Sequence, residues 1–167
     1  HNAAILGIDV SKIDSVIISH GHNDHTWGLT HLAQYLDRIN HPSTKKIKLV
    51  AHPNAFQPKY HEDKSIGANL PADSYPTFFE RVNQKGVYHL TDNLLFLGEI
   101  ERNNNFEGRY PIGKTVDCCG HEVDDFVLDD SAIVYTSPTG IVIITGCSHS
   151  GICNIVDYAI KITGDKR

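Results

Sequence analysis

The sequence contains no methionine, and its apolar residues occur only in short runs. A membrane-spanning helix requires about 20 consecutive apolar residues, so a membrane partner is not expected. The chain also lacks a block of basic residues and carries a formal net charge of −5. Clustered Lys and Arg neutralise the phosphates of nucleic acids, so a nucleic-acid partner is not expected either. Because the first residue is His1 rather than methionine, we expect the sequence to be a piece of a longer protein.

Cysteine is scarce as well. The 4 cysteines in 167 residues lack the CxxC pairs of a zinc ribbon and the density of a secreted disulfide scaffold. This usage is typical of a reducing compartment, so a cytoplasmic location is expected. Cys118, Cys119 and the nearby His121 could form a soft metal site, but the neighbouring sequence shows no fourth ligand. We expect ordinary loop thiols there, and the metal site remains the alternative.

The remaining composition is that of a folded domain, with 40% hydrophobic and 21% charged residues. These values exclude the low hydrophobicity and high charge of a disordered chain. A compact chain of this length hides roughly 70% of the surface that its unfolded form exposes. We therefore expect residues 1–167 to form a single domain with its own hydrophobic core.

Short β-branched runs alternate with amphipathic stretches, which indicates a layered α/β architecture. Residues 29–39 and the segment from Ile152 to Gly164 have apolar residues at helical spacing, and the glycine ends the second run. Residues 57–86 and 103–125 are expected to be mostly loop. The expected strands are residues 15–19, 47–51, 87–89, 94–97, 132–136 and 141–145, and the last two form a hairpin.

The most informative segment is the HxHxDH pattern from His20 to His25, directly after the first expected strand. Zinc binds imidazole nitrogen and carboxylate oxygen, and ligands this close in sequence converge only where the backbone turns sharply. Gly21 and Asn23 tolerate such a turn. The pattern predicts that His20, His22, Asp24 and His25 bind metal, serving two adjacent positions. A solvated histidine-rich loop is the alternative, but the motif and its context disfavour it.

A second strand, residues 141–145, delivers His149 before the last helix begins. Two strands that each present histidine at one end of a sheet can share a metal centre, so His149 is predicted as a further ligand. The alternative is a capping or core histidine. Cys147 lies two residues away, and we expect it to be a small buried residue rather than a ligand.

Such a site would hold one or two divalent ions. Zinc is expected, and manganese or iron are the alternatives. A bound ion lowers the pKa of water from about 15.7 to near 7. Asp24 is the only carboxylate within the motif, so it is predicted to orient the attacking hydroxide as the catalytic residue. Hydrolysis is the expected reaction.

The loop from His20 to His25 resembles the signature loop of the metallo-β-lactamase superfamily. Other segments are similar to one of its branches, the metal-dependent hydrolases akin to the dihydropterin ribofuranosyl-aminobenzene phosphate synthase of methanogens. The segments that carry this likeness are residues 6–9 with 13–14, 51–56, 98–102 with 106–107, 129–130, and 145–152 with 154–156.

The resemblance implies a four-layered αββα sandwich, of α/β (α+β) class, with metals at one edge of two sheets. It implies that His20, His22 and His149 hold a first metal, and that Asp24 and His25 hold part of a second. The family's first strands and later histidine-bearing segments have no counterpart in this sequence. The resemblance therefore implies a domain that is incomplete at both ends.

A metal-dependent hydrolase of a small molecule, phosphorylated or pterin-like if the branch resemblance holds, is the leading functional hypothesis. An iron-dependent redox enzyme of the same fold and a non-catalytic, metal-stabilised relic are the alternatives. His52, at the end of a strand, is either a substrate contact or a structural loop residue. Glu107, Asp129 and Asp130 are expected to be solvated loop carboxylates, with an orienting role for the histidines as the alternative.

Overall fold

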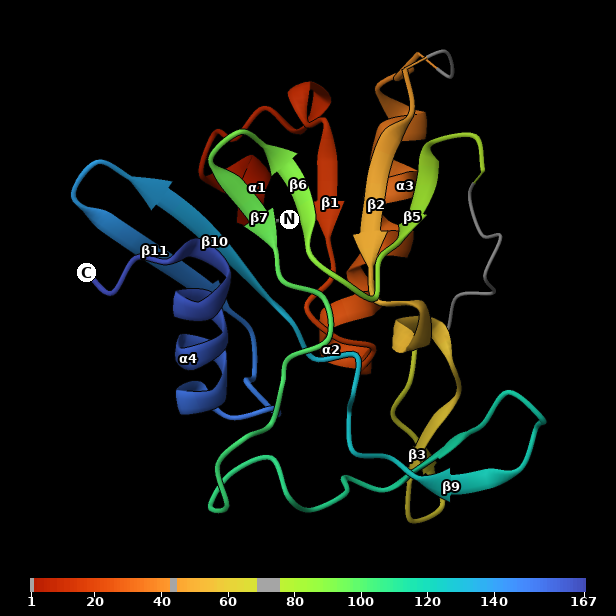
Figure 1. Cartoon of the computed structure of the whole chain (residues 1–167). Helices are drawn as coiled ribbons and strands as arrows, with labels where there is room; N and C mark the ends of the chain where they lie inside the picture. Colours follow the sequence, from red (N-terminus) through yellow and green to blue (C-terminus); the bar gives the residue numbers. More distant parts are fainter. Residues whose placement is uncertain (1, 43–44, 69–75) are drawn as a thin grey trace.

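The computed structural model describes residues 2–42, 45–68 and 76–167. Two long helices and three sheets make up the molecule (Figure 1). The helical elements are α1 (Asn2–Ile5), η1 (Val10–Lys12), α2 (Asn23–Thr26), α3 (Gly28–Arg38), η2 (Pro53–Phe56) and α4 (Ile152–Thr163). No helix in the described ranges is long and apolar enough to cross a membrane.

The first sheet is parallel and has the order β1-β2-β5, with β1 at Ser15–Ile17, β2 at Ile47–Ala51 and β5 at Phe79–Asn83. Helix α3 covers one face of it. The buried side chains of Leu29, Ala33 and Leu36 recur at helical spacing and pack with Ile47 and Phe79 in one core cluster. This burial stabilises the helix mainly through its apolar face.

The second sheet is antiparallel and has the order β11-β10-β7-β6. Its strands are β6 (Tyr88–Thr91), β7 (Leu94–Phe96), β10 (Ala132–Ser137) and β11 (Gly140–Thr145). Helix α4 packs on it, with Ile155 and Ala159 in the same buried cluster as Leu97 and Val134. The helix ends at Gly164, whose φ of 73° is the left-handed conformation typical of a helix stop.

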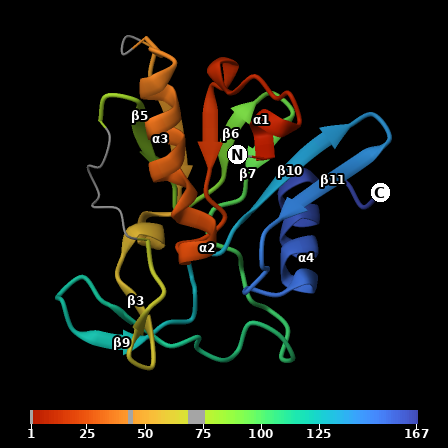
Figure 2. The ribbon, with the colours of Figure 1, turned by 180° about the vertical axis from the view of Figure 1, so that it is seen from behind.

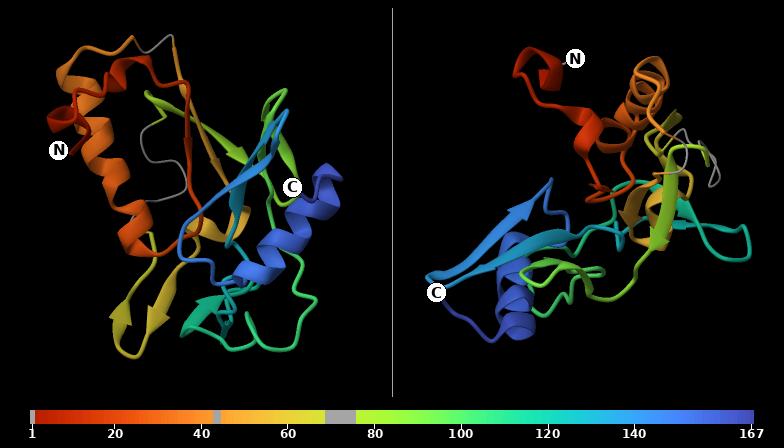
Figure 3. Two further views of the ribbon diagram at one scale, coloured as in Figure 1. Left: turned by 90° about the vertical axis from the view of Figure 1, so that its left-hand side faces the viewer. Right: turned by 90° about the horizontal axis from the view of Figure 1, so that it is seen from above.

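Figures 2 and 3 show α3 and α4 on opposite outer sides, with the two sheets between them. This is the expected αββα arrangement. The two long helices, strand β2 and the β10–β11 hairpin also confirm the elements predicted from hydrophobic spacing.

A third sheet corrects the expectation of loops in residues 57–86 and 103–125. It has the order β4-β3-β8-β9, with β3 at Lys59–His61, β4 at Lys64–Ser65, β8 at Lys114–Val116 and β9 at Glu122–Asp124. Strand β5 also begins within the first of these segments. The strands of the third sheet are short and largely exposed, so they lack the apolar alternation that marks a strand.

Candidate metal centre

The loop after β1 and the loop after β11 meet at one end of the two sheets (Figure 1), and together they gather four imidazole rings. The ring centroid of His20 lies 4.6 Å from that of His22, 4.2 Å from that of His25 and 4.7 Å from that of His149. His22 and His149 are 4.8 Å apart by the same measure. The structure therefore brings together histidines that are more than a hundred residues apart in sequence, as the metal hypothesis requires.

The rings of His20, His22 and His149 are held in the neutral state that a metal ligand needs. His20 is fully buried, and burial together with the neighbouring histidines lowers its pKa to about 3. Burial also lowers the pKa values of His22 and His149. A neutral imidazole offers a lone pair without first losing a proton, so the cluster is prepared to bind a cation at neutral pH.

The donor atoms of the cluster fit a metal ion. His20 Nε2 lies 3.0 Å from His22 Nδ1, and two nitrogens on a tetrahedral zinc ion lie about 3.3 Å apart. Among the described residues, the Nε2 atoms of His22 and His149 are buried and have no hydrogen-bond partner. Buried polar nitrogens are normally satisfied, so these unpartnered atoms are available to a ligand, and His22 can offer an ion either Nδ1 or Nε2 but not both.

Asp24 and His25 lie at the exposed side of the same cluster. His25 Nε2 is 3.4 Å from Asp24 Oδ2, and the Asp24 side chain is 67% exposed. One donor atom from each of Asp24, His25 and His20 falls within 4.8 Å of the others. The five sequence-predicted residues are thus in one place, with Asp24 nearest to solvent.

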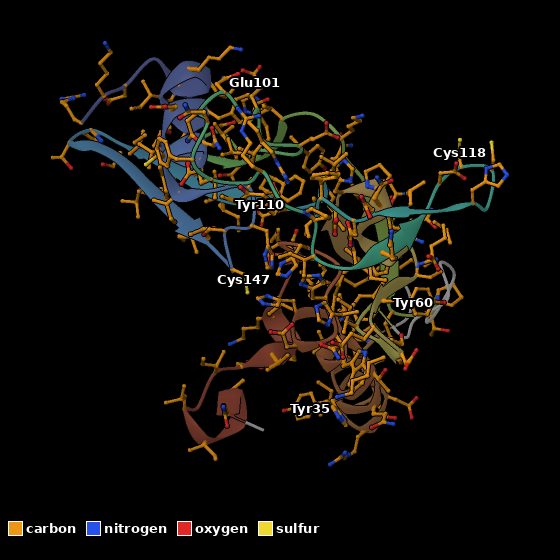
Figure 4. All side chains as sticks on the ribbon, turned by 90° about the horizontal axis from the view of Figure 1, so that it is seen from below. Tyr35, Tyr60, Glu101, Tyr110, Cys118 and Cys147 are labelled. Carbon is orange, nitrogen blue, oxygen red and sulfur yellow. The ribbon has the colours of Figure 1, made fainter. Side chains whose placement is uncertain are left out.

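Cys147 is a candidate that the sequence interpretation set aside. It is exposed rather than buried, and its Sγ lies 3.1 Å from His25 Nε2. Its sulfur also lies within 4.8 Å of donor nitrogens of His20 and His149. Partial burial and the charge of Asp24 raise the pKa of this thiol. The expectation of a small buried residue is therefore wrong, because the loop after β11 turns the side chain toward the histidines (Figure 4).

Ser19 orients two of the rings. Its hydroxyl lies 3.2 Å from Nδ1 of His20 and 3.2 Å from Nδ1 of His25. One hydroxyl oxygen can accept a hydrogen bond from both ring N–H groups, and Nε2 of each ring then faces the other donors of the cluster, His22 Nδ1 and Cys147 Sγ. Ser19 directly precedes the motif, and this adjacency is the only sequence signal that could have indicated its role.

Gly21 and Asp129 fix the backbone of the histidine loop. The Gly21 N–H donates to Asp129 Oδ2 at 2.6 Å. A Cβ at Gly21 would lie only 2.1 Å from the carbonyl oxygen of Ala55, so no other residue fits without moving η2. Asp129 is buried, and the expectation of a solvated loop carboxylate is wrong because this bond draws it inside.

Asp130 holds the second loop in the same manner. Its Oδ2 accepts the backbone N–H of Ser150 at 2.9 Å and the Ser150 hydroxyl at 2.5 Å. Ser150 follows His149, so the bond sets the position of that ring. Asp130 is fully buried, which again corrects the expectation of a solvated residue.

A buried lysine stands behind this arrangement. Lys59 is 1% exposed, and its Nζ lies 2.8 Å from both Asp125 Oδ2 and Asp129 Oδ1. Burial alone would raise the pKa of Asp129, but the Lys59 charge and the Gly21 N–H outweigh burial and lower it. The lysine therefore keeps the carboxylate that holds Gly21 ionised.

Two further candidates have structural contacts. His52 is buried, accepts the Asn54 N–H at Nδ1 and lies 3.3 Å from Glu99 Oε2 at Nε2. This matches the structural alternative rather than the substrate contact. Glu107 accepts the Asn154 N–H at 2.7 Å and so satisfies the first turn of α4, instead of being solvated.

An open groove of about 490 Å³ leads to the cluster. Its lining combines His22, Asp24 and His149 with His61 and Lys64 of the β3–β4 hairpin. The groove therefore joins the imidazole cluster to cationic and hydrogen-bonding side chains from another sheet.

The family model of the metallo-β-lactamase superfamily matches residues 2–84, which include the histidine loop after β1. The crystal structure of Tm1679, described as a metal-dependent hydrolase of the β-lactamase superfamily, matches with a TM-score of 0.73 and 26% sequence identity. The match covers 98% of this chain and 57% of that chain. The chain is thus similar to the metallo-β-lactamase superfamily in sequence and in fold, and members of that superfamily typically bind divalent metals.

Within the superfamily, one relative is the 7,8-dihydropterin-6-methyl-4-(β-D-ribofuranosyl)-aminobenzene-5′-phosphate synthase of Methanocaldococcus jannaschii. It is 33% identical over 171 residues, which cover 98% of this chain and 56% of the relative. An uncharacterised protein of the same organism is 30% identical over 155 residues, 90% of this chain and 54% of that protein. The chain thus spans about half the length of the curated relatives that it matches.

Proposed function

We propose that the chain carries the metal centre of a metal-dependent hydrolase that acts on a small, anionic molecule. The observation that carries this proposal is the convergence of His20, His22 and His149, in which the buried Nε2 atoms of His22 and His149 lack a partner among the described residues. These three would hold one divalent ion. Asp24 and His25, with Cys147 beside them, would contribute to a second position.

Zinc suits this mixture of imidazole, carboxylate and thiol donors. When bound, a divalent ion would lower the pKa of water and polarise a carbonyl or phosphoryl oxygen. The protein's own side chains would orient the reacting groups and move a proton. The exposed carboxylate of Asp24 lies at the groove beside His25, where it can accept the proton of an attacking water.

The groove supports an anionic, phosphorylated substrate. Lys64 and His61 line it together with the histidine cluster, and they pair across the β3–β4 hairpin. An ammonium group binds phosphate as a point charge. The phosphate in the name of the methanogen synthase agrees with this choice, and a pterin-like remainder is a natural extension of the same proposal. The cysteine usage supports a cytoplasmic setting.

The test combines metal analysis with turnover of phosphoester substrates by the purified chain. We expect one to two zinc ions per chain and a hydrolytic activity that falls sharply in Asp24→Asn, while the ion held by His20, His22 and His149 is retained. Lys64→Met should raise KM more than it lowers kcat, because it removes a binding charge rather than a reacting group. Lys12→Met, at an exposed lysine outside the groove, serves as the matched control.

The alternatives give different results in the same experiment. Iron with an oxygen-dependent product would indicate a redox enzyme of this fold. A single ion without any turnover would indicate a metal-stabilised relic. An unaltered pH–rate profile in Asp24→Asn would argue against the proton-accepting role of Asp24.

A further inference from the structure

The β8–β9 hairpin carries a second cluster of metal-binding side chains, in a turn of sequence Asp-Cys-Cys-Gly-His at residues 117–121, here called the DCCGH turn. Figure 4 shows Cys118 at the tip of this hairpin, far from Cys147 at the histidine cluster. The turn belongs to the third sheet and shares no residue with the candidate metal centre. Any ligand that it binds therefore occupies a separate site.

The backbone of the turn is fixed by Asp117. Its Oδ1 accepts the N–H of Cys119 at 2.8 Å and the N–H of His121 at 2.9 Å. The Asp117 N–H donates to the carbonyl of His121 at 2.9 Å, and Gly120 has the left-handed φ of 83° that closes the turn. The side chains around the turn are thus presented by an ordered backbone rather than by a free loop.

Three donor groups, from Asp117, Cys119 and His121, lie in one small volume, and the thiol of Cys118 lies beside that of Cys119. Cys118 Sγ and Cys119 Sγ are 3.8 Å apart, and two thiolates bound to tetrahedral zinc at about 2.3 Å lie about 3.8 Å apart. One donor atom from each of Asp117, Cys119 and His121 falls within 4.8 Å of the others. Asp117 Oδ2, which accepts neither backbone N–H, lies 3.3 Å from His121 Nδ1.

The sequence alone shows two thiols and an imidazole without a fourth donor, and the structure supplies that donor as Asp117. Sulfur and imidazole donors select thiophilic and borderline cations such as Zn²⁺ over Mg²⁺ or Ca²⁺. Both cysteines are exposed, so an ion can enter without local unfolding. The exposed side chains can also rotate to shorten the remaining distances.

We infer that the DCCGH turn is a second metal site, in which Cys118, Cys119, His121 and Asp117 bind one thiophilic divalent cation such as Zn²⁺. Binding displaces the thiol protons to solvent, so the affinity rises with pH. The ion closes the β8–β9 hairpin at its tip. This inference is independent of the hydrolase proposal, since it uses none of the same side chains.

The test uses the complete chain and Zn²⁺ or Co²⁺ alone. The Cys118→Ser/Cys119→Ser double variant should bind one ion fewer than the wild type and lose most of the thiolate-to-cobalt absorption. Cys147 is present in both the wild type and the double variant, so its contribution to the cobalt absorption cancels in the difference between them. His121→Gln should weaken the same ion by about 10-fold or more, whereas Cys153→Ser, at an exposed cysteine on α4, should leave binding unchanged.

Alkylation followed by peptide mapping gives a second readout. Saturating Zn²⁺ should protect Cys118 and Cys119 but leave the rate at Cys153 unchanged. Equal ion counts in the wild type and the double variant, or equal alkylation with and without Zn²⁺, would overturn the inference. So would a peptide 2 Da lighter with no bound metal, because it would show a disulfide between the adjacent cysteines.

Discussion

Asp129 and Asp130 are consecutive in the chain, yet their carboxylates hold two different histidine-bearing loops. Asp129 accepts the backbone N–H of Gly21, and Asp130 accepts the N–H and the hydroxyl of Ser150. The pair lies just before β10, between the sheets that carry the two loops. The relative position of the imidazoles therefore depends on this one acidic pair as much as on the histidines themselves.

Asp130→Asn should lower the affinity for Zn²⁺ by roughly 10- to 100-fold, the loss typical of groups that orient a ligand without touching the metal. The neutral amide weakens the two bonds from Ser150 that set the position of His149. Competition with a chelator measures the affinity. Asp157→Asn, on the exposed side of α4, is the matched control, and equal affinities in all three proteins would contradict the orienting role.

His22→Ala and His149→Ala should each lower the affinity for the first ion by at least about 10-fold, because each removes a proposed ligand. Metal content after dialysis against a weak chelator is the measurement. His31→Ala removes an exposed imidazole from α3 and should retain wild-type content. If both of the first two variants also retain it, the three-histidine ligand set is refuted.

Lys59→Met should lower the free energy of unfolding by about 3–5 kcal/mol, because it leaves two buried carboxylates without their cation. Urea denaturation measures the change. Lys161→Met breaks a solvent-exposed pair with Glu101 and should cause little change. A loss as small as that of Lys161→Met would show that Asp125 and Asp129 do not depend on Lys59.

The metal-free protein should lose stability as the pH falls from about 6.5. Burial depresses the pKa of His20 from 6.5 to about 3, so the unfolded chain binds more protons than the folded one within that window. The contribution of His20 to the free energy of unfolding is therefore fully present above pH 6.5 and declines as the pH falls toward 3. Urea midpoints across this range measure the slope, which should be shallower in His20→Asn and unchanged in His89→Gln, at an exposed ring on β6.

Elements with a strong local pattern could be predicted from the sequence. Helix α3 buries Leu29, Ala33 and Leu36, which stand at the spacing of one helix face, and β2 is a short run that is apolar except for the exposed Lys48. The HxHxDH motif is contiguous, so its chemistry is legible without a structure. His149 could be predicted because it follows a strand in the same way as His20.

The parts that escaped prediction depend on contacts between distant segments. Lys59 reads as a surface residue until Asp125 and Asp129, more than sixty positions later, surround its Nζ. The third sheet consists of short polar strands without a period. Cys147 could not be placed because its spacing from His149 does not reveal which way the turn directs the sulfur.

The proposed ligands His20 and His22 come after β1, a strand of the sheet covered by α3. His149 comes after β11, a strand of the sheet covered by α4. An ion held by all three would be a reversible cross-link between the two halves of the sandwich. Removing the ion with a chelator would then loosen both halves of the sandwich at once. Amide hydrogen exchange would accelerate in strands far from the imidazoles as well as near them.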